Sequence, residues 1–134
     1  MTNGKQRLRI TSLGGVGEVG KNALLVEHGR DLVLIDAGVM FPEEELLGVD
    51  LVIPDFTYLV HNVERLRGVL LTHGHEDHIG AVPYLLRQLG TRTAIYGLPL
   101  TLGLLEPKLQ EHGVTELADL RPCHAGEPIT LGSL

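Results

Sequence analysis

The chain has 134 residues, 43% of them hydrophobic, which is enough for one domain with a core and too few for two typical domains. Its formal net charge of −6 gives no general attraction for a polyanion such as RNA, and its single cysteine, Cys123, excludes an internal disulfide. No apolar stretch approaches the roughly 20 residues of a membrane-spanning helix, and no apolar signal segment follows the polar start, so we expect a cytoplasmic protein.

The first forty residues are predicted to form consecutive antiparallel strands. Residues 8–13 alternate loosely between apolar and polar side chains, and a glycine-rich turn follows at residues 14–20. Two short apolar runs, 23–27 and 32–35, are then separated by His-Gly-Arg-Asp, which is typical of a hairpin.

The glycine-rich turn formally matches the dinucleotide fingerprint G-x-G-x-x-G at residues 15–20, and Asp36 lies near the expected place of a ribose-binding acid. A nucleotide-binding oxidoreductase is therefore an alternative. That function requires a helix to begin within the glycine run, so that its N-terminus meets the pyrophosphate. Residues 23–26 have strand-like rather than helical spacing, so we expect the glycines to serve a tight turn.

The later elements alternate between helices and strands. In chain order we expect a long loop (39–58) with a short strand (51–53), a short helix (60–67), a buried strand (68–71), a helix (80–89), a strand (93–96), a helix (99–112) and a tail of short strands and turns (117–134). Pro83 falls in the first turn of its helix, and Pro107 should kink or break its own. Hairpins followed by alternating helices and strands predict an α/β layered architecture with a mixed sheet.

The residues after the buried strand carry the chemistry. Imidazole and carboxylate together fit zinc or manganese better than calcium or copper. His73 and His75 would share one face of an extended strand end, and Asp77 and His78 would point to a second position where a helix begins, so the sequence predicts two ions. A surface loop that is merely rich in histidine rarely carries the aspartate at this spacing. Glu76 is expected to face solvent without a chemical role.

With this cluster, the glycine-rich turn and the Ile-Asp-Ala-Gly strand end, the sequence resembles the ribonuclease J branch of the metallo-β-lactamase superfamily. The residues that carry the resemblance are 14–22, 35–55 and 72–87. The resemblance implies an αββα sandwich, of which residues 1–134 would be a partial metallo-β-lactamase domain.

The resemblance also implies site roles. His73 and His75 would bind one ion, and Asp77 and His78 the other. Asp36 would hold ligands by hydrogen bonds, with a turn-capping aspartate as the alternative. A structural calcium would bind backbone carbonyls at Leu47 and Val49.

Family members complete the site with further His and Asp ligands and a beta-CASP domain, which we expect downstream of residue 134. The remaining histidines are expected to be surface or loop residues: His28, His61, His112 and His124.

The implied function is a metal-dependent ribonuclease that cuts single-stranded RNA from a 5′ end and internally, in RNA maturation and decay, often as a dimer or tetramer. Two ions would activate a hydroxide for attack on the phosphodiester. Two alternatives stay open: another binuclear hydrolase acting on a thioester or lactone, and a non-catalytic fragment. With an incomplete ligand set, the 134-residue chain alone is expected to be inactive and to leave apolar surface uncovered on the far side of the sheet.

Overall fold

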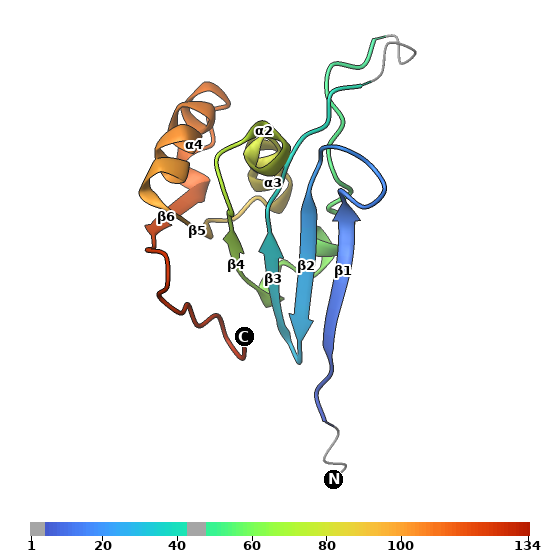
Figure 1. Ribbon diagram of the computed structural model, residues 1–134, viewed down its shortest axis with the longest axis vertical. Coiled ribbons are helices and arrows are strands. Elements are labelled where there is room, and N and C mark those ends of the chain that lie inside the picture. The colour runs from blue at the N-terminus through green and yellow to red at the C-terminus, as the bar shows by residue number, and fades with distance from the viewer. Residues whose placement is uncertain (1–4, 43–47) are drawn as a thin grey trace.

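Six strands pair in the order in which they occur along the chain (Figure 1). The computed structural model describes residues 5–42 and 48–134. Its strands are β1 (Leu8–Gly14), β2 (Ala23–His28), β3 (Asp31–Ile35), β4 (Leu66–Leu70), β5 (Thr93–Gly97) and β6 (Ala118–Pro122). β1, β2 and β3 are antiparallel, whereas β3, β4, β5 and β6 are parallel. The predicted α/β class with a mixed sheet is confirmed.

Both antiparallel connections form as predicted. His28 pairs with Asp31 across a two-residue turn that begins with Gly29 at a φ of 60°. The glycine-rich turn leads from β1 directly into β2, with Gly15, Gly17 and Gly20 at positive φ. Because no helix begins in this turn, the dinucleotide-binding alternative is excluded.

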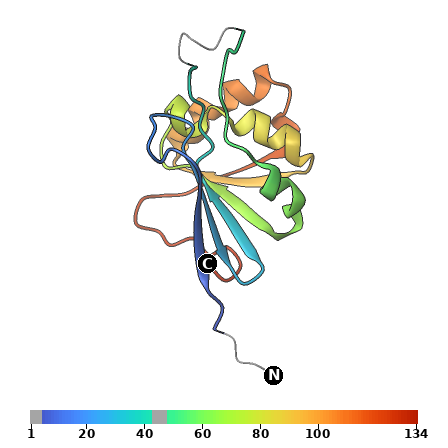
Figure 2. The ribbon, with the colours of Figure 1, turned by 90° about the vertical axis from the view of Figure 1, so that its right-hand side faces the viewer.

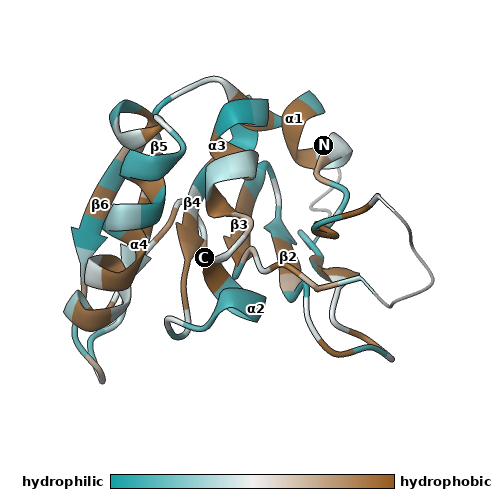
Figure 3. Ribbon diagram, turned by 90° about the horizontal axis from the view of Figure 1, so that it is seen from above, coloured by the Kyte–Doolittle hydropathy of each residue, from teal (hydrophilic) through white to brown (hydrophobic). Residues whose placement is uncertain are grey.

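The helices lie on one side of the sheet (Figure 2). They are α1 (Thr57–His61), α2 (Glu76–Ile79), α3 (Val82–Leu89) and α4 (Pro99–Glu111), and single 3₁₀ turns occupy Val63–Arg65 and Thr115–Leu117. Side chains of α3 and α4 such as Leu85 and Leu105 are fully buried with Val69 and Ile95 of the sheet, and form the core. The central strands β3 and β4 are apolar, whereas α2 is hydrophilic (Figure 3). No helix in the described part of the chain is long and apolar enough to cross a membrane.

Proline and glycine mark the ends of α3 as predicted, whereas Pro107 does not break α4. Pro83 lies in the first turn of α3, and Gly90 ends that helix in the left-handed conformation at a φ of 65°. α4 continues through Pro107 without a break and is followed by Gly113, at a φ of 66°. The expected break at Pro107 is therefore wrong, and a kink at this residue stays a prediction.

The predicted helix over residues 60–67 is wrong in its position. α1 begins earlier because the Asp55 carboxylate accepts hydrogen bonds from the backbone N–H of Thr57, at 2.9 Å, and from its hydroxyl, at 2.6 Å. The chain leaves the helical conformation at Asn62. The short strand expected at 51–53 is a single bridge between Met40 and Val52.

The C-terminal segment runs across the face of the sheet opposite the helices (Figure 2). Leu131 is buried there, and Ile129, Leu131 and Leu134 border a hollow of about 150 Å³ with apolar residues of β2, β3 and β4. The expectation of an uncovered far face is therefore wrong for the middle of the sheet. It holds at the edge strand β1, where Leu8 and Ile10 are exposed.

Asp31 fixes this segment to the β2–β3 hairpin. Its carboxylate accepts a 2.8 Å hydrogen bond from the backbone N–H of Ser133 and pairs with Arg67 Nε at 2.5 Å. The Ser133 hydroxyl also lies 2.8 Å from His28 Nδ1. The hydrogen bonds from Arg67 and Ser133 lower the pKa of Asp31 from 3.8 to about 2.

We predict that this carboxylate contributes to stability above pH 3.8 and that the contribution is lost as the pH falls towards 2, because protonation removes its charge. Urea denaturation at a series of pH values measures this. In Asp31→Asn the part of the acid-induced loss that lies in this window should be absent. An identical pH profile for the variant and the wild type would contradict the assignment.

Candidate metal centre

The histidine cluster lies in the loop that follows β4 and in the single turn of α2. β4 ends at Leu70, and His75 is the extended residue immediately before α2. The backbone carbonyl of His75 accepts hydrogen bonds from the N–H groups of His78 and Ile79, both at 2.9 Å. This short turn bends the chain back, so that side chains of α2 lie beside the residues that lead into it.

Three of the four predicted ligands converge. Donor atoms of His73, Asp77 and His78 all lie within 4.8 Å of one another, and each of these residues is half-buried. His78 Nε2 is 3.6 Å from Asp77 Oδ2, and the rings of His73 and His78 are 3.9 Å apart between centroids. Nitrogen and carboxylate donors in this arrangement fit a divalent ion such as zinc.

His75 lies beside this group rather than within it. Its ring is edge-on to that of His73, with centroids 4.7 Å apart, and the residue is exposed. The His75 imidazole could therefore bind an ion on the solvent side of the cluster. The assignment of His73 and His75 to one ion, and of Asp77 and His78 to another, stays a prediction.

Asp36 holds His78 from the interior of the protein. Its carboxylate is buried, and Oδ2 is 2.7 Å from His78 Nδ1. A carboxylate accepts hydrogen bonds, so this contact places the proton on Nδ1 and leaves the Nε2 lone pair on the side of Asp77. Asp36 therefore fixes both the orientation and the tautomer of a candidate ligand.

Thr72 completes the hydrogen bonding of Asp36. The carboxylate accepts the Thr72 backbone N–H at 2.8 Å and the Thr72 hydroxyl at 2.8 Å. The Asp36 backbone N–H donates to the Leu70 carbonyl, also at 2.8 Å. The side-chain partners of Asp36 thus lie far along the chain rather than in its own turn, which differs from the turn-capping alternative.

Backbone hydrogen bonds join three distant segments beneath the cluster. Ala37 N–H donates to the His78 carbonyl at 2.8 Å, Gly38 N–H to the Asn22 carbonyl at 3.0 Å, and Asn22 N–H to the Asp77 carbonyl at 3.0 Å. A Cβ atom on Gly38 would lie 1.6 Å from the Asp77 carbonyl oxygen. Only glycine permits this approach of the β3 end to α2.

Asn22 and Thr72 are parts of the site that the sequence did not predict. Asn22 Nδ2 donates to the Asp77 carbonyl at 3.0 Å and lies 3.4 Å from His78 Nε2. Both residues belong to stretches that carry the family resemblance, at residues 14–22 and 72–87. Only that resemblance could have identified the two residues as parts of the site, because no local spacing distinguishes either of them.

Glu76 is exposed, as expected, but its carboxylate also has a partner within the protein. Its carboxylate forms an ion pair with Lys108 of α4, although the Glu76 side chain is 46% exposed. The positive charge of Lys108 on α4 attracts the Glu76 carboxylate on α2. The pair thus links the short helix of the site to a long one.

The other predicted positions lie apart from the cluster. His28 contacts Ser133, the ring of His112 packs edge-on against Tyr84, and His61 and His124 are exposed. Cys123 is a free, partly buried thiol. Of the two expected calcium ligands, Val49 is exposed and Leu47 lies outside the described residues.

A family model described as the metallo-beta-lactamase superfamily matches residues 16–119. The chain belongs to this superfamily. Members of the fold bind divalent metal, and His73, Asp77 and His78 with their hydrogen-bonded support fit such an ion.

The resemblance to ribonuclease J is also confirmed. Ribonuclease J2 of Bacillus subtilis is 46% identical over 128 residues, which are 96% of this chain and 23% of that protein. Ribonuclease J of Helicobacter pylori is 48% identical over 112 residues, 84% of this chain and 16% of that protein. The chain therefore spans 16–23% of the length of these two relatives.

Solved structures agree on the fold. Human tRNase Z, short form, superposes with a TM-score of 0.54 at 17% identity, covering 84% of this chain and 44% of that one. The metallo-beta-lactamase fold protein YhfI of Bacillus subtilis gives 0.57 at 18% identity, covering 93% and 50%.

Replacing Asp36 with Asn tests the support of His78. Asparagine tolerates the positive φ of 65° at this position, so the backbone should be unchanged. Its amide N–H₂ would face His78 Nδ1 and favour the tautomer with the proton on Nε2, which blocks the donor. We expect zinc affinity, measured by calorimetry, to fall about 10–100-fold. Asp50→Asn removes the same charge from an exposed residue, and equal affinities in the two variants would refute this role.

Gly38→Ala should destabilise the fold, because the added methyl group overlaps the Asp77 carbonyl. We expect a loss of about 2–4 kcal/mol in the free energy of unfolding, measured by urea denaturation. Gly103→Ala is the matched control. Gly103 is exposed in α4 with no atom within 4 Å of a new Cβ, so alanine should stabilise the helix by about 0.5–1 kcal/mol. If Gly38→Ala unfolds at the same urea concentration as the wild type, the contact between this position and the Asp77 carbonyl is not tight.

Proposed function

We propose that this chain carries metal-binding residues of a metal-dependent ribonuclease that acts on single-stranded RNA. The observation that supports this most is the 46–48% identity to ribonucleases J across the region that holds the cluster. The three converging donors and the Asp36 contact are the features that a hydrolytic metal site requires.

We propose zinc as the metal, with manganese as the alternative, because the donors are imidazole nitrogen and carboxylate oxygen. His73, His75, Asp77 and His78 would hold two ions. When bound, the ions would lower the pKa of a water molecule and neutralise charge on the phosphodiester oxygens.

Four side chains are too few for two ions that each need about three protein ligands. The resemblance supplies further His and Asp ligands and a beta-CASP domain, and the active form would contain them. We therefore propose that the 134-residue chain by itself does not cleave RNA.

The residues of this chain act mainly by positioning. Asp36 keeps the proton on Nδ1 of His78, so that Nε2 stays available as a donor. The Asn22 amide fixes the carbonyl of Asp77, and the ion pair of Glu76 with Lys108 ties the first residue of the same turn to α4. These contacts pre-arrange the donors before metal binds, which lowers the cost of assembling the site.

Several finer features come from the resemblance alone. We propose cleavage both from a 5′ end and internally, a role in RNA maturation and decay in the cytoplasm, and a homodimer or homotetramer. A structural calcium at the backbone carbonyls of Leu47 and Val49 belongs to the same proposal.

The decisive experiment offers 5′-monophosphorylated single-stranded RNA and, separately, a thioester to the full-length protein loaded with zinc or manganese. We expect RNA cleavage that falls roughly a hundredfold or more in His78→Ala, because the variant lacks a ligand. His61→Ala, an exposed histidine outside the cluster, should be unaffected.

Hydrolysis of the thioester alone would replace the ribonuclease proposal with the other binuclear hydrolase. The same assay on the 134-residue chain tests its inactivity. Robust RNA cleavage by this chain that disappears in His75→Ala would contradict that part of the proposal.

A further inference from the structure

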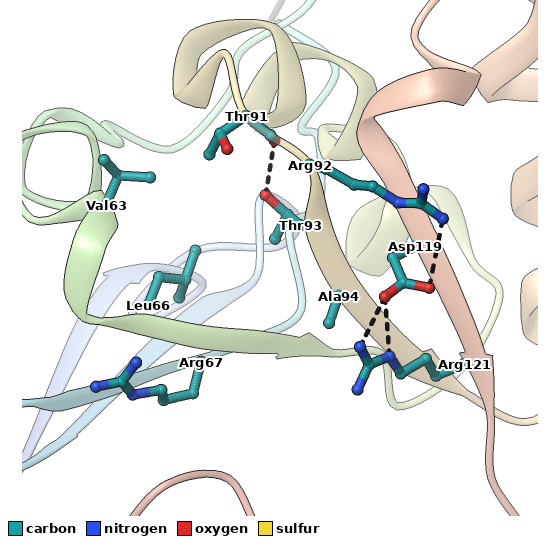
Figure 4. Close-up of a pocket in the computed structure, with 9 residues that line it drawn as sticks. All are labelled: Val63, Leu66, Arg67, Thr91, Arg92, Thr93, Ala94, Asp119 and Arg121. Carbon is teal, nitrogen blue, oxygen red and sulfur yellow. Dashed lines mark hydrogen bonds and ion pairs between the residues drawn. The ribbon is translucent and has the colours of Figure 1, made fainter.

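A polar hollow of about 300 Å³ (Figure 4) lies where β4, β5 and β6 begin. It is lined at the start of β4 by Leu66 and Arg67, at the start of β5 by Thr93 and Ala94, and at the start of β6 by Asp119. The metal cluster follows the other end of β4. Because a strand rises about 3.3 Å per residue, the five-residue β4 separates the two places by roughly 15 Å.

Arginine dominates the ionic side chains of this hollow. Arg67, Arg92 and Arg121 line it together with one acid, Asp119, so the lining carries a formal charge of +2, three positive charges less one negative, in a chain of net charge −6. The arginine side chains are 43%, 69% and 53% exposed, respectively, and can therefore be reached from solvent.

Arg121 is held in a defined orientation. Its Nε and Nη2 donate to Asp119 Oδ2 at 3.0 and 2.8 Å, and its Nη1 donates to the Tyr96 hydroxyl at 3.0 Å. The guanidinium also lies 5.7 Å from the centroid of the Tyr96 ring. The hydrogen bonds that Arg121 donates to Asp119 and Tyr96 raise its pKa further, so the group stays charged. A guanidinium held in this way loses little entropy when it binds an anion.

Arg92 forms a long ion pair with Asp119 but no hydrogen bond with it. Its Nη2 lies 3.8 Å from Asp119 Oδ1, which is beyond hydrogen-bond distance, and it makes no hydrogen bond to the described residues. Arg67 is paired with Asp31 through Nε, and its guanidinium points away from Arg92 and Arg121 (Figure 4). The donors that lie beside Arg121 are therefore those of Arg92.

We propose that this hollow binds an oxyanion of the phosphate class, held chiefly by Arg92 and Arg121, with Arg67 at its rim. Guanidinium groups match the oxygen geometry of phosphate and form charge-assisted hydrogen bonds with it. The phosphate group can come from the backbone of single-stranded RNA or from a free phosphate or nucleotide. This inference does not rest on the proposed ribonuclease function, because it uses none of the metal-ligand residues.

The test is a titration of the isotope-labelled chain in which NMR monitors the chemical shifts of the backbone amides of residues 91–94 and 119–121. Separate arms use inorganic phosphate, a nucleoside monophosphate and a short single-stranded RNA without a terminal phosphate, each with and without zinc. We expect saturable shifts with a Kd for phosphate on the order of 1 mM, unchanged by zinc. Tight binding of the RNA identifies a phosphodiester as the ligand, whereas binding of only the small anions identifies free phosphate.

Four variants make the result specific. Arg92→Ala and Arg121→Ala should each weaken binding by about threefold to tenfold, since each removes a charge-assisted contact. Asp119→Asn should tighten it, because the substitution removes the competing negative charge and keeps an amide oxygen that can accept the hydrogen bonds of Arg121. Arg9→Ala removes the same charge from an exposed residue outside the hollow and should change the affinity by less than about twofold.

Circular dichroism and urea denaturation show which variants remain folded, and Arg92→Ala removes no hydrogen bond that the described residues make. The proposal is overturned if no saturable shift occurs at residues 91–94 and 119–121. It is also overturned if Arg9→Ala weakens binding as much as Arg92→Ala does, because the effect would then reflect only net charge.

Discussion

The buried carboxylate of Asp36 is the interaction on which the candidate site depends. It lies at the end of β3 and accepts hydrogen bonds from the backbone and hydroxyl of Thr72, just after β4, and from His78 in α2. A carboxylate without partners would be costly at this depth, whereas one with three donors is stable and rigid. One side chain therefore joins the ends of two parallel strands to the turn that carries the candidate ligands.

The arrangement of the sheet makes this junction possible. β3 and β4 are parallel neighbours, so their carboxyl ends reach the same edge, and the loops after them meet there. The β1–β2 turn ends beside the same edge and delivers Asn22 to the carbonyl of Asp77. Gly38 lets the backbones approach closely enough for these hydrogen bonds to form. The short helix α2 is stabilised by these contacts, since a helix of four residues has little stability of its own.

Much of this fold follows from local patterns in the sequence. Alternating side chains and glycine-rich turns predict β1, β2 and β3, and the spacing from His73 to His78 identifies the cluster because the residues are close in sequence. Asn22 and Thr72 could not be found in this way, because their partners Asp77 and Asp36 lie 55 and 36 residues away. The start of α1 does not follow from the apolar spacing of residues 60–67, because it depends on the hydrogen bonds that Thr57 donates to the Asp55 carboxylate. Local chemistry thus predicts elements and ligands, whereas the contacts that orient the ligands depend on the tertiary fold.

Local charge would allow an acidic chain to bind a phosphate-bearing ligand. Electrostatic forces between exposed groups are screened over about 8 Å at physiological salt, so local charge matters more than the net value of −6. At one edge of the sheet, divalent ions on the histidine cluster would make the local charge positive. At the opposite edge, roughly 15 Å away by the rise of β4, Arg67, Arg92 and Arg121 outnumber the single acid of their hollow. That separation exceeds the screening length, so each edge would attract an anion independently. A strand of RNA is long enough to reach both, whereas a free phosphate is not.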